Sequence, residues 1–306
     1  MFEIIRPNTK INFLAKWKFL VALSVGLLLL SAVFLKINGL HFGVDFQGGT
    51  EAHYRFAAGV KVEDDKLRSL VSGLGFEDVS VVRFGAAEDN EFLVRFKGDP
   101  GERGERIQTL REQVASQIGA LDTGSELRIE FVGPKVGEEL RRDGIRALAY
   151  TCLLILIYIA FRFSPRFAPG AVIALVHDVL ITAGIFVILG YSFDLQVLAA
   201  LLAIIGYSLN DTIIVFDRIR ENMELRTKVD LVSVVNESVN QTLSRTLLTS
   251  LTTLFAVLAL LFLGGAVIRP FALAMAIGIG VGTYSSIFVA SPLLYLWYAR
   301  RAKTGS

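Results

Sequence analysis

The chain has 306 residues, 53% of them hydrophobic, and its mean hydropathy is +0.54. This composition indicates a polytopic membrane protein with one sizeable soluble insert. The net charge of +2 gives no indication of a nucleic-acid partner. The single cysteine, Cys152, excludes an intramolecular disulfide.

Six apolar runs are candidates for crossing a bilayer, whose hydrocarbon core is about 30 Å thick. The first, of 17 residues, is longer than the apolar region of a signal peptide and lacks a small-residue cleavage site. We therefore expect an uncleaved helix. Arg146 and Arg162 flank the short second run, whose helix we expect to begin earlier. The long last run is expected to tilt or to break at Pro292. The predicted spans are Phe19–Leu35, Ala147–Phe161, Pro169–Tyr191, Leu195–Phe216, Thr246–Val267 and Phe271–Tyr298.

The short loops and termini predict the orientation of the chain. One side of the membrane receives 14 Lys and Arg residues, whereas the short loops on the opposite side carry only Arg269. Positively charged loops stay in the cytoplasm, so both termini are expected there. The predicted divisions are the N-terminus with the first span (1–36), an extracytoplasmic domain (37–146) and the remaining five spans with their cytoplasmic loops (147–306).

The segment between the first two spans reads as an α+β domain. Four segments have an alternating or otherwise strand-like pattern of apolar and polar residues, and two have the amphipathic pattern of helices. Their order, β-α-β-β-α-β, is that of a ferredoxin-like domain. The strands are Thr50–Phe56, Asp78–Phe84, Glu91–Lys97 and Glu126–Val132, and the helices are Val62–Leu74 and Glu105–Ile118.

This domain carries a net charge of −5 and shows neither a metal-ligand cluster nor a nucleophile beside a base. A binding module therefore fits better than an enzyme, and we expect no catalytic residue, metal or cofactor. His41 and His53 stand alone in the sequence and are interpreted as surface or structural residues.

A glycine-rich turn, HFGVDFQGGT, precedes the first predicted strand. The adjacent Gly48 and Gly49 permit positive φ angles and close backbone approach. Asp45 is expected to cap a turn or to hold the domain against the membrane. Together with Gly43, these residues suggest a hinge or, equally, a rigid tether. A phosphate-binding loop is a poor interpretation, because no Lys-Ser/Thr pair follows.

Asp211 lies within the fourth predicted span, where a charged side chain costs at least ~2.5–3.5 kcal/mol on insertion scales. Such residues are rare and usually functional. Tyr207, Ser208 and Asn210 add polar groups beside it. The cluster predicts a hydrated or proton-handling site inside a helix bundle.

Arg245 begins the fifth predicted span, from which its side chain would reach Asp211 if these two spans pack together. Alternation between burial and the approach of a cation would let the carboxyl group load and release a proton. We therefore interpret Asp211 as a proton carrier and Arg245 as its modulator or gate. The alternative is that Asp211 only holds helices together.

Four further residues are weaker candidates. His177 and Asp178, in the third span, either join the proton path or bond to a neighbouring helix. Asp217 is either a cytoplasmic relay or part of a solvated helix end. Asn210 directly precedes Asp211 and offers hydrogen bonds close to it.

Two segments suggest helix contacts. The amphipathic stretch Asp230–Ser244 resembles a separate helix lying on the inner leaflet. Gly278 and Gly282 form a GxxxG pattern in a small-residue surface, whose partner helix belongs either to this chain or to a companion subunit.

Three segments resemble a known family. FGVDFQGGT resembles the GxDFxGGT signature of SecD and SecF, and Ser208–Asn222 (SLNDTIIVFDRIREN) resembles the fourth-span signature of SecF. Ser238–Ser250 (SVNQTLSRTLLTS) is also similar to SecF. The resemblance extends over nearly the whole chain, including the six spans, and the length fits a stand-alone SecF.

This resemblance implies a bacterial inner-membrane protein that pairs with SecD in a pseudo-symmetric complex of the RND superfamily. The complex would use the proton-motive force to draw unfolded preproteins through SecYEG after the SecA-driven step, and YajC is a further partner. The family residues linked to proton conduction match Asp211 and Arg245. Two alternatives stay open: half of an RND-type exporter of small molecules or lipids, and a passive scaffold unaffected by neutralising Asp211.

Overall fold

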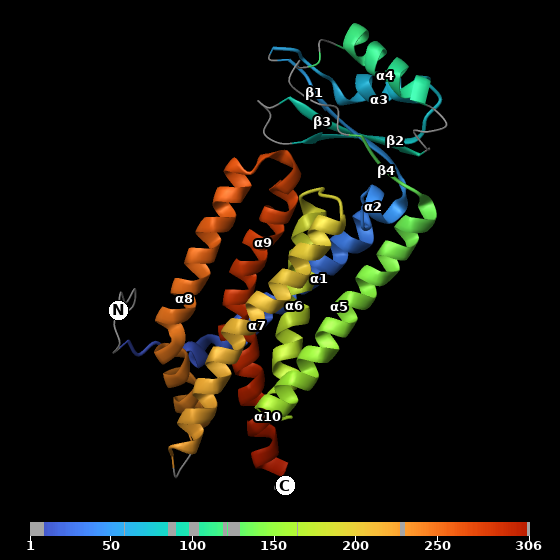
Figure 1. The fold of residues 1–306 in the computed structure, drawn as a ribbon. Coiled ribbons are helices and arrows are strands. Elements are labelled where there is room, and N and C mark those ends of the chain that lie inside the picture. The colour runs from blue at the N-terminus through green and yellow to red at the C-terminus, as the bar shows by residue number, and fades with distance from the viewer. Residues whose placement is uncertain are drawn as a thin grey trace.

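The structure, a computed structural model, describes residues 9–57, 59–84, 90–97, 104–118, 121, 129–163, 165–226 and 230–304. A bundle of long helices forms one part, and a small α+β domain stands at one end of it (Figure 1). Among the described residues, six helical segments are long and apolar enough to span a membrane. The multi-pass architecture predicted from hydropathy is therefore confirmed.

The six predicted spans correspond in order to the six helical segments, with differences at two ends. The third predicted span continues past the end of its helix at Ile188, and the fifth continues past the end of its helix at Leu263. The second helix does begin earlier than its apolar run, at Pro134, where a proline at the first helical position loses no hydrogen bond. The long helices are α1 (Trp17–Asn38), α5 (Pro134–Arg162), α6 (Ala168–Ile188), α7 (Leu195–Glu224), α8 (Leu231–Leu263), α9 (Gly265–Ser285) and α10 (Ser291–Thr304), with a 3-10 turn at Phe13–Lys16 before α1.

The prediction of a separate interfacial helix over Asp230–Ser244 was wrong. This stretch is the first half of α8, which runs without interruption from Leu231 to Leu263. Its apolar stripe meets protein rather than lipid, because α7 extends past its predicted end to Glu224 and offers a partner surface. The buried residues of the stripe pack in one cluster with Phe216 and Ile219 of α7; they are Val234, Val235, Val239 and Leu243.

The last span is interrupted just before Pro292, between α9 and α10. Residues Ser286–Ala290 form a π-helical turn, and α10 begins at Ser291. Because proline clashes with the preceding turn of an α-helix and lacks an N–H, a wider turn accommodates it. The Ser291 hydroxyl donates to the carbonyl oxygen of Ser286 at 2.9 Å and so satisfies one acceptor there.

The α+β domain has the predicted order of strands and helices. The described strands form an antiparallel sheet in the order β2-β3-β1-β4, with Thr50 of β1 opposite Phe96 of β3. Residues 126–128 of the predicted last strand lie outside the described part of the chain. The elements are α2 (Val44–Gln47), β1 (Gly49–Arg55), α3 (Asp64–Gly73), β2 (Glu77–Phe84), β3 (Glu91–Lys97), α4 (Gly104–Gln117) and β4 (Ile129–Val132).

The two faces of this sheet differ in chemistry. Helices α3 and α4 cover the face away from the bundle (Figure 1), where Tyr54, Phe92 and Val94 are fully buried with Leu67 and Leu110. Alternation along the strands places polar side chains on the opposite face.

The polar face carries ion pairs and looks toward the membrane helices. Arg95 pairs with Glu51 at 2.5 Å, and His53 contacts the buried Glu91 at 3.1 Å, so His53 does have a partner.

Candidate functional site

Asp211 is fully buried where α7 packs against α8 and α9. Its Oδ2 atom accepts a hydrogen bond of 3.2 Å from the Ser250 hydroxyl of α8. Ser250 also bonds to the Thr283 hydroxyl of α9 at 2.8 Å, so the contact joins three helices. The Oδ1 atom of Asp211 is buried and has no hydrogen-bond partner within the described residues. A carboxyl group with one unsatisfied buried oxygen calls for a functional explanation.

Arg245 lies on α8, five residues before Ser250, and its side chain is exposed. Within the described part of the chain, Arg245 forms no ion pair with Asp211, whose hydrogen-bond partner is Ser250. The predicted packing of the fourth and fifth spans is present, since α7 contacts α8. The modulating role of Arg245 stays a prediction.

Asp178 forms a second buried carboxylate centre that connects α6, α7 and α9. Its Oδ2 atom accepts hydrogen bonds from Ser208 at 2.6 Å and from Ser285 at 2.7 Å. Its Oδ1 atom lies 2.8 Å from Nδ1 of His177. Both oxygens of Asp178 therefore have partners, in contrast to those of Asp211.

His177 extends this second centre toward α1. Its ring stacks on Tyr284, with centroids 6.4 Å apart, and the Tyr284 hydroxyl donates to the carbonyl oxygen of Leu20 at 2.8 Å. The Nε2 atom of His177 is buried and has no partner among the described residues.

Small residues bring α9 close against α7 at Ser208 and at Ile204, one helical turn before it. A Cβ atom on Gly278 would lie 2.3 Å from the Ile204 side chain, and one on Gly282 would lie 2.9 Å from Cβ of Ser208. The partner of the GxxxG pattern is thus a helix of this same chain. Ser208 precedes Asp211 by one helical turn, so the two buried centres adjoin along α7.

The structure does not bring Asn210 or Asp217 to Asp211. Asn210 is exposed on the outer surface of α7. Asp217 is half-exposed near the end of α7 and lies 3.9 Å from Arg162 and 3.7 Å from Arg220. These surface pairs are worth little individually, so either role predicted for Asp217 is compatible with them.

The glycine-rich turn docks on the loop that leads into α7. The N–H of Gly43 donates to the carbonyl oxygen of Phe193 at 2.6 Å, and Phe193 donates back to His41 at 2.7 Å. The Asp45 carboxylate accepts from the N–H of Leu195 at 2.9 Å. Asp45 therefore caps α7 and holds the turn at the membrane helices, in agreement with one of its predicted roles.

The adjacent glycines of this turn have the predicted conformations. Gly48 and Gly49 have φ angles of +75° and +121°. A Cβ on Gly48 would also lie 2.6 Å from Cα of Pro134, at the start of α5. This turn therefore contacts the first residues of both α5 and α7.

Sequence reasoning did not identify four of the polar residues in the buried centres: Ser250, Thr283, Tyr284 and Ser285 act as hydrogen-bond partners in the structure. Ser250 ends one of the segments that resemble SecF, which was an available signal. The other three lie in a span whose small residues suggested only helix packing.

Two family models match the chain. Residues 34–57, which contain the glycine-rich turn, match the SecD/SecF GG motif. Residues 113–300, which contain Asp178, Asp211 and Arg245, match the C-terminal model of the protein export membrane proteins SecD and SecF. The chain belongs to the SecD/SecF family. Its SecF-like relatives include a protein translocase subunit SecF from Desulfurispirillum indicum, 46% identical over 95% of this chain and 92% of the relative.

Further relatives include both stand-alone SecF subunits and longer SecDF proteins. A SecF subunit from Vibrio alginolyticus is 44% identical over 96% of this chain and 91% of its own length. A SecDF subunit from Thermus thermophilus is 43% identical over 96% of this chain, which spans only 39% of that protein.

Solved structures of SecDF confirm the fold. A crystal structure of SecDF from Thermus thermophilus superposes with a TM-score of 0.87, at 41% identity, over 97% of this chain and 40% of that one. A second, described as the super-membrane-facing form, is 40% identical, covers 100% of this chain and 40% of that one, and has a TM-score of 0.71. At nearly equal identity, the second differs more in shape from this chain.

Proposed function

We propose that this chain is a SecF-type accessory subunit of the Sec protein translocase. It pairs with a SecD chain and promotes the movement of preproteins through SecYEG after the step driven by SecA. Family membership and relatives named as translocase subunits support this proposal. The longer SecDF relatives, of which this chain matches about two fifths, support the pairing with SecD. YajC is a further proposed partner.

The energy source that we propose is the proton-motive force, and the observation that carries this part is the environment of Asp211. A carboxyl group that lies inside a membrane helix, is fully buried and has one oxygen without a partner in the described structure is suited to gain and lose a proton. Its other oxygen is tied to α8 and α9 through Ser250 and Thr283. A change in protonation would therefore alter contacts among three helices.

The remaining polar residues have supporting roles in this proposal. Arg245 modulates the charge at Asp211 from the exposed side of α8. Asp178 and His177 serve mainly to pair α6, α7 and α9, because both Asp178 oxygens have hydrogen-bond partners. Asp217, close to Arg162 and Arg220, lies where a proton would leave α7. Asn210, on the outer surface of α7, lies where a companion subunit or lipid would pack.

We propose that the protein lies in the bacterial inner membrane with both termini in the cytoplasm. The 14 Lys and Arg residues on one side, against one in the opposite short loops, support this orientation. The α+β domain then lies outside the cytoplasm, where an unfolded preprotein emerges. We further propose that this domain moves relative to the membrane helices as the preprotein is drawn out.

An exporter of small molecules or lipids would share the buried aspartate and the spans. The glycine-rich turn and the SecF-like relatives favour the translocase subunit instead.

The test is an export assay with vesicles that contain SecYEG, SecD and this chain, energised with SecA and a proton-motive force. Asp211→Asn preserves size and hydrogen bonding but removes the titratable group. We expect this variant to assemble normally and to lack the proton-dependent stimulation of export. That stimulation is the part that an uncoupler abolishes in the wild type. Glu221→Gln, a carboxylate 55% exposed on the same helix, is the matched control and should retain the stimulation.

Each alternative outcome has a clear meaning. Normal stimulation with Asp211→Asn would refute the assignment of the proton carrier and would favour a passive scaffold. A wild-type complex that stimulates export equally with and without an uncoupler would refute proton coupling itself.

A further inference from the structure

The extracytoplasmic domain is joined to the start of α7 by contacts from two of its parts. One part is the glycine-rich turn, whose backbone pairs with that of Phe193 through Gly43 and His41. Gly43 lies so close that a Cβ there would be 3.1 Å from Cβ of Asp194. The turn is thus fixed to the loop before α7 by main-chain hydrogen bonds without intervening side chains.

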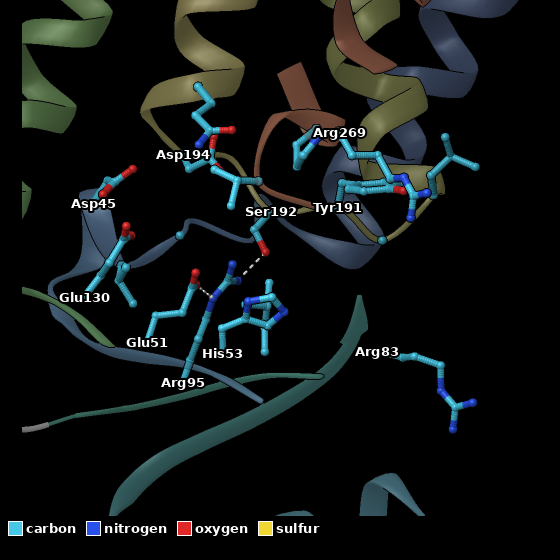
Figure 2. Close-up of a pocket in the computed structure, with 18 residues that line it drawn as sticks. Asp45, Glu51, His53, Arg83, Arg95, Glu130, Tyr191, Ser192, Asp194 and Arg269 are labelled. Carbon is cyan, nitrogen blue, oxygen red and sulfur yellow. Dashed lines mark hydrogen bonds and ion pairs between the residues drawn. The ribbon is translucent and has the colours of Figure 1, made fainter. Parts of the chain in front are cut away.

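The second part is the polar face of the sheet. Arg95 of β3 lies between Glu51 of β1 and Ser192 of the α6–α7 loop, and it donates hydrogen bonds to both (Figure 2). A cavity of about 240 Å³ separates the sheet from this loop, and Asp45 and Asp194 lie on its wall. Arg95 therefore bridges the domain and the loop beside the cavity.

Two residues cap the first turn of α7: one directly precedes the helix, and the other belongs to the glycine-rich turn of the domain. Asp194 is the N-cap residue and accepts from the N–H of Val197 at 2.8 Å. The N–H of Leu195, the first residue of the helix, donates to Asp45, which is 150 residues away in sequence. Negative groups at a helix N-terminus also interact favourably with the helix dipole.

We propose that Asp45 is a positioning residue through which the glycine-rich turn holds α7 in register with the extracytoplasmic domain. Movement of the domain then displaces the helix that carries Asp211. This inference rests on the proposed proton-driven function and identifies the contact that couples movement of the domain to the helix that carries Asp211.

The continuous helix α7 connects the Asp45 contact to Asp211. Leu195 and Asp211 are 16 residues apart, which is about 24 Å along one uninterrupted helix. An α-helix transmits an axial shift along its length, so a shift at the cap reaches the Ser250 contact. Gly278 and Gly282 let α9 pack closely against α7, so a shift of α7 would also be felt at this contact.

The test removes the same hydrogen bond from each of its ends in the SecYEG vesicles that also contain SecD. Asp45→Ala removes the acceptor. Leu195→Pro removes the donor at the first helical position, where proline is tolerated and where Asp194 already has the extended backbone that precedes a proline. Asp45→Asn keeps an acceptor, and Leu195→Ala keeps the N–H; both are matched controls.

We expect Asp45→Ala and Leu195→Pro each to reduce the proton-dependent stimulation of export at least threefold, with SecA-driven export and assembly unchanged. The double variant should be no worse than either single variant, because both remove one interaction. Both controls should stay within twofold of the wild type. Hydrogen exchange should show faster opening of the first turn of α7 in Asp45→Ala.

Full stimulation with either Asp45→Ala or Leu195→Pro would overturn the proposal, as would an Asp45→Asn variant as impaired as Asp45→Ala. If Asp45→Ala fails to accumulate, Leu195→Pro alone decides between these results. Asp211→Asn is measured in parallel. If Asp211→Asn also retains stimulation, the proposed proton-driven function fails. If Asp211→Asn loses stimulation but Asp45→Ala behaves like the wild type, only the positioning role of Asp45 fails.

Discussion

Ser208 of α7 donates a hydrogen bond of 2.6 Å to Asp178 of α6, one helical turn before Asp211 on the same helix. Two buried carboxyl groups are thereby held near one another by helices of a single chain, with unequal surroundings. Asp178 has partners for both oxygens, whereas Asp211 has one partner, Ser250, among the described residues. This difference is the basis of our proposals that Asp178 pairs helices and that Asp211 exchanges a proton.

Replacement of Asp178 tests its pairing role. Asp178→Ala leaves the buried Ser208 hydroxyl without its acceptor and should lower the free energy of unfolding by about 1–3 kcal/mol. Asp178→Asn keeps an oxygen that accepts hydrogen bonds and should lose less. Thermal unfolding of the purified chain in detergent measures both. Equal stability of all three proteins would contradict a pairing role.

The contact between α7 and α9 gives a second prediction. Gly278→Ala places a methyl group about where the Ile204 side chain lies, and such overpacking typically costs about 1–3 kcal/mol. Gly280, two residues away, has open space around it, so Gly280→Ala should be neutral or stabilising by about 0.5–1 kcal/mol. The melting temperature in detergent should therefore fall for Gly278→Ala and stay level or rise for Gly280→Ala, and equal falls for both variants would argue against this packing.

Asp194 predicts a pH dependence at the end of α7 that faces the α+β domain. Burial raises the pKa of Asp194 from 3.8 to about 6, and the nearby carboxylates of Asp45 and Glu51 act in the same direction. The N–H of Val197 and the charge of Arg95 oppose this shift. The folded protein therefore binds this proton more tightly than the unfolded chain does. Protonation as the pH falls through 6 should stabilise the fold.

The measurement compares thermal unfolding of the wild type and of Asp194→Asn between pH 7.5 and pH 4.5. Relative to the variant, the wild type should gain on the order of 1–3 kcal/mol as the pH falls. The same pH dependence in both proteins would show that Asp194 does not titrate in this range.

Hydropathy and alternation were sufficient to locate the six spans and to give the order of elements in the α+β domain. They failed at Asp230–Ser244, where an apolar stripe such as that of Val235 and Val239 is compatible with either a lipid surface or a protein partner. The structure supplies the partner, because α7 continues past Phe216 and buries Ile219 against this stripe. Periodicity gives the buried face of a helix and does not identify what covers it.

The candidate site was predicted in part. Asp211 was selected as a candidate because a carboxyl group among apolar residues is costly, and this signal needs no tertiary information. The structure shows that this side chain is buried, and its role stays a prediction. Ser250 and the cap that Asp45 provides for Leu195 depend on contacts between residues 39 and 150 positions apart. Contacts between residues so far apart leave no periodic pattern in a single sequence, so they could be identified only in the folded structure.

The most direct measurement is proton flux into liposomes that contain the complex of this chain with SecD, driven by an imposed membrane potential and followed with an internal pH indicator. We predict flux with the wild type and with Glu221→Gln, and none above background with Asp211→Asn. Undiminished flux through Asp211→Asn would contradict the conclusion that this carboxyl group carries the proton.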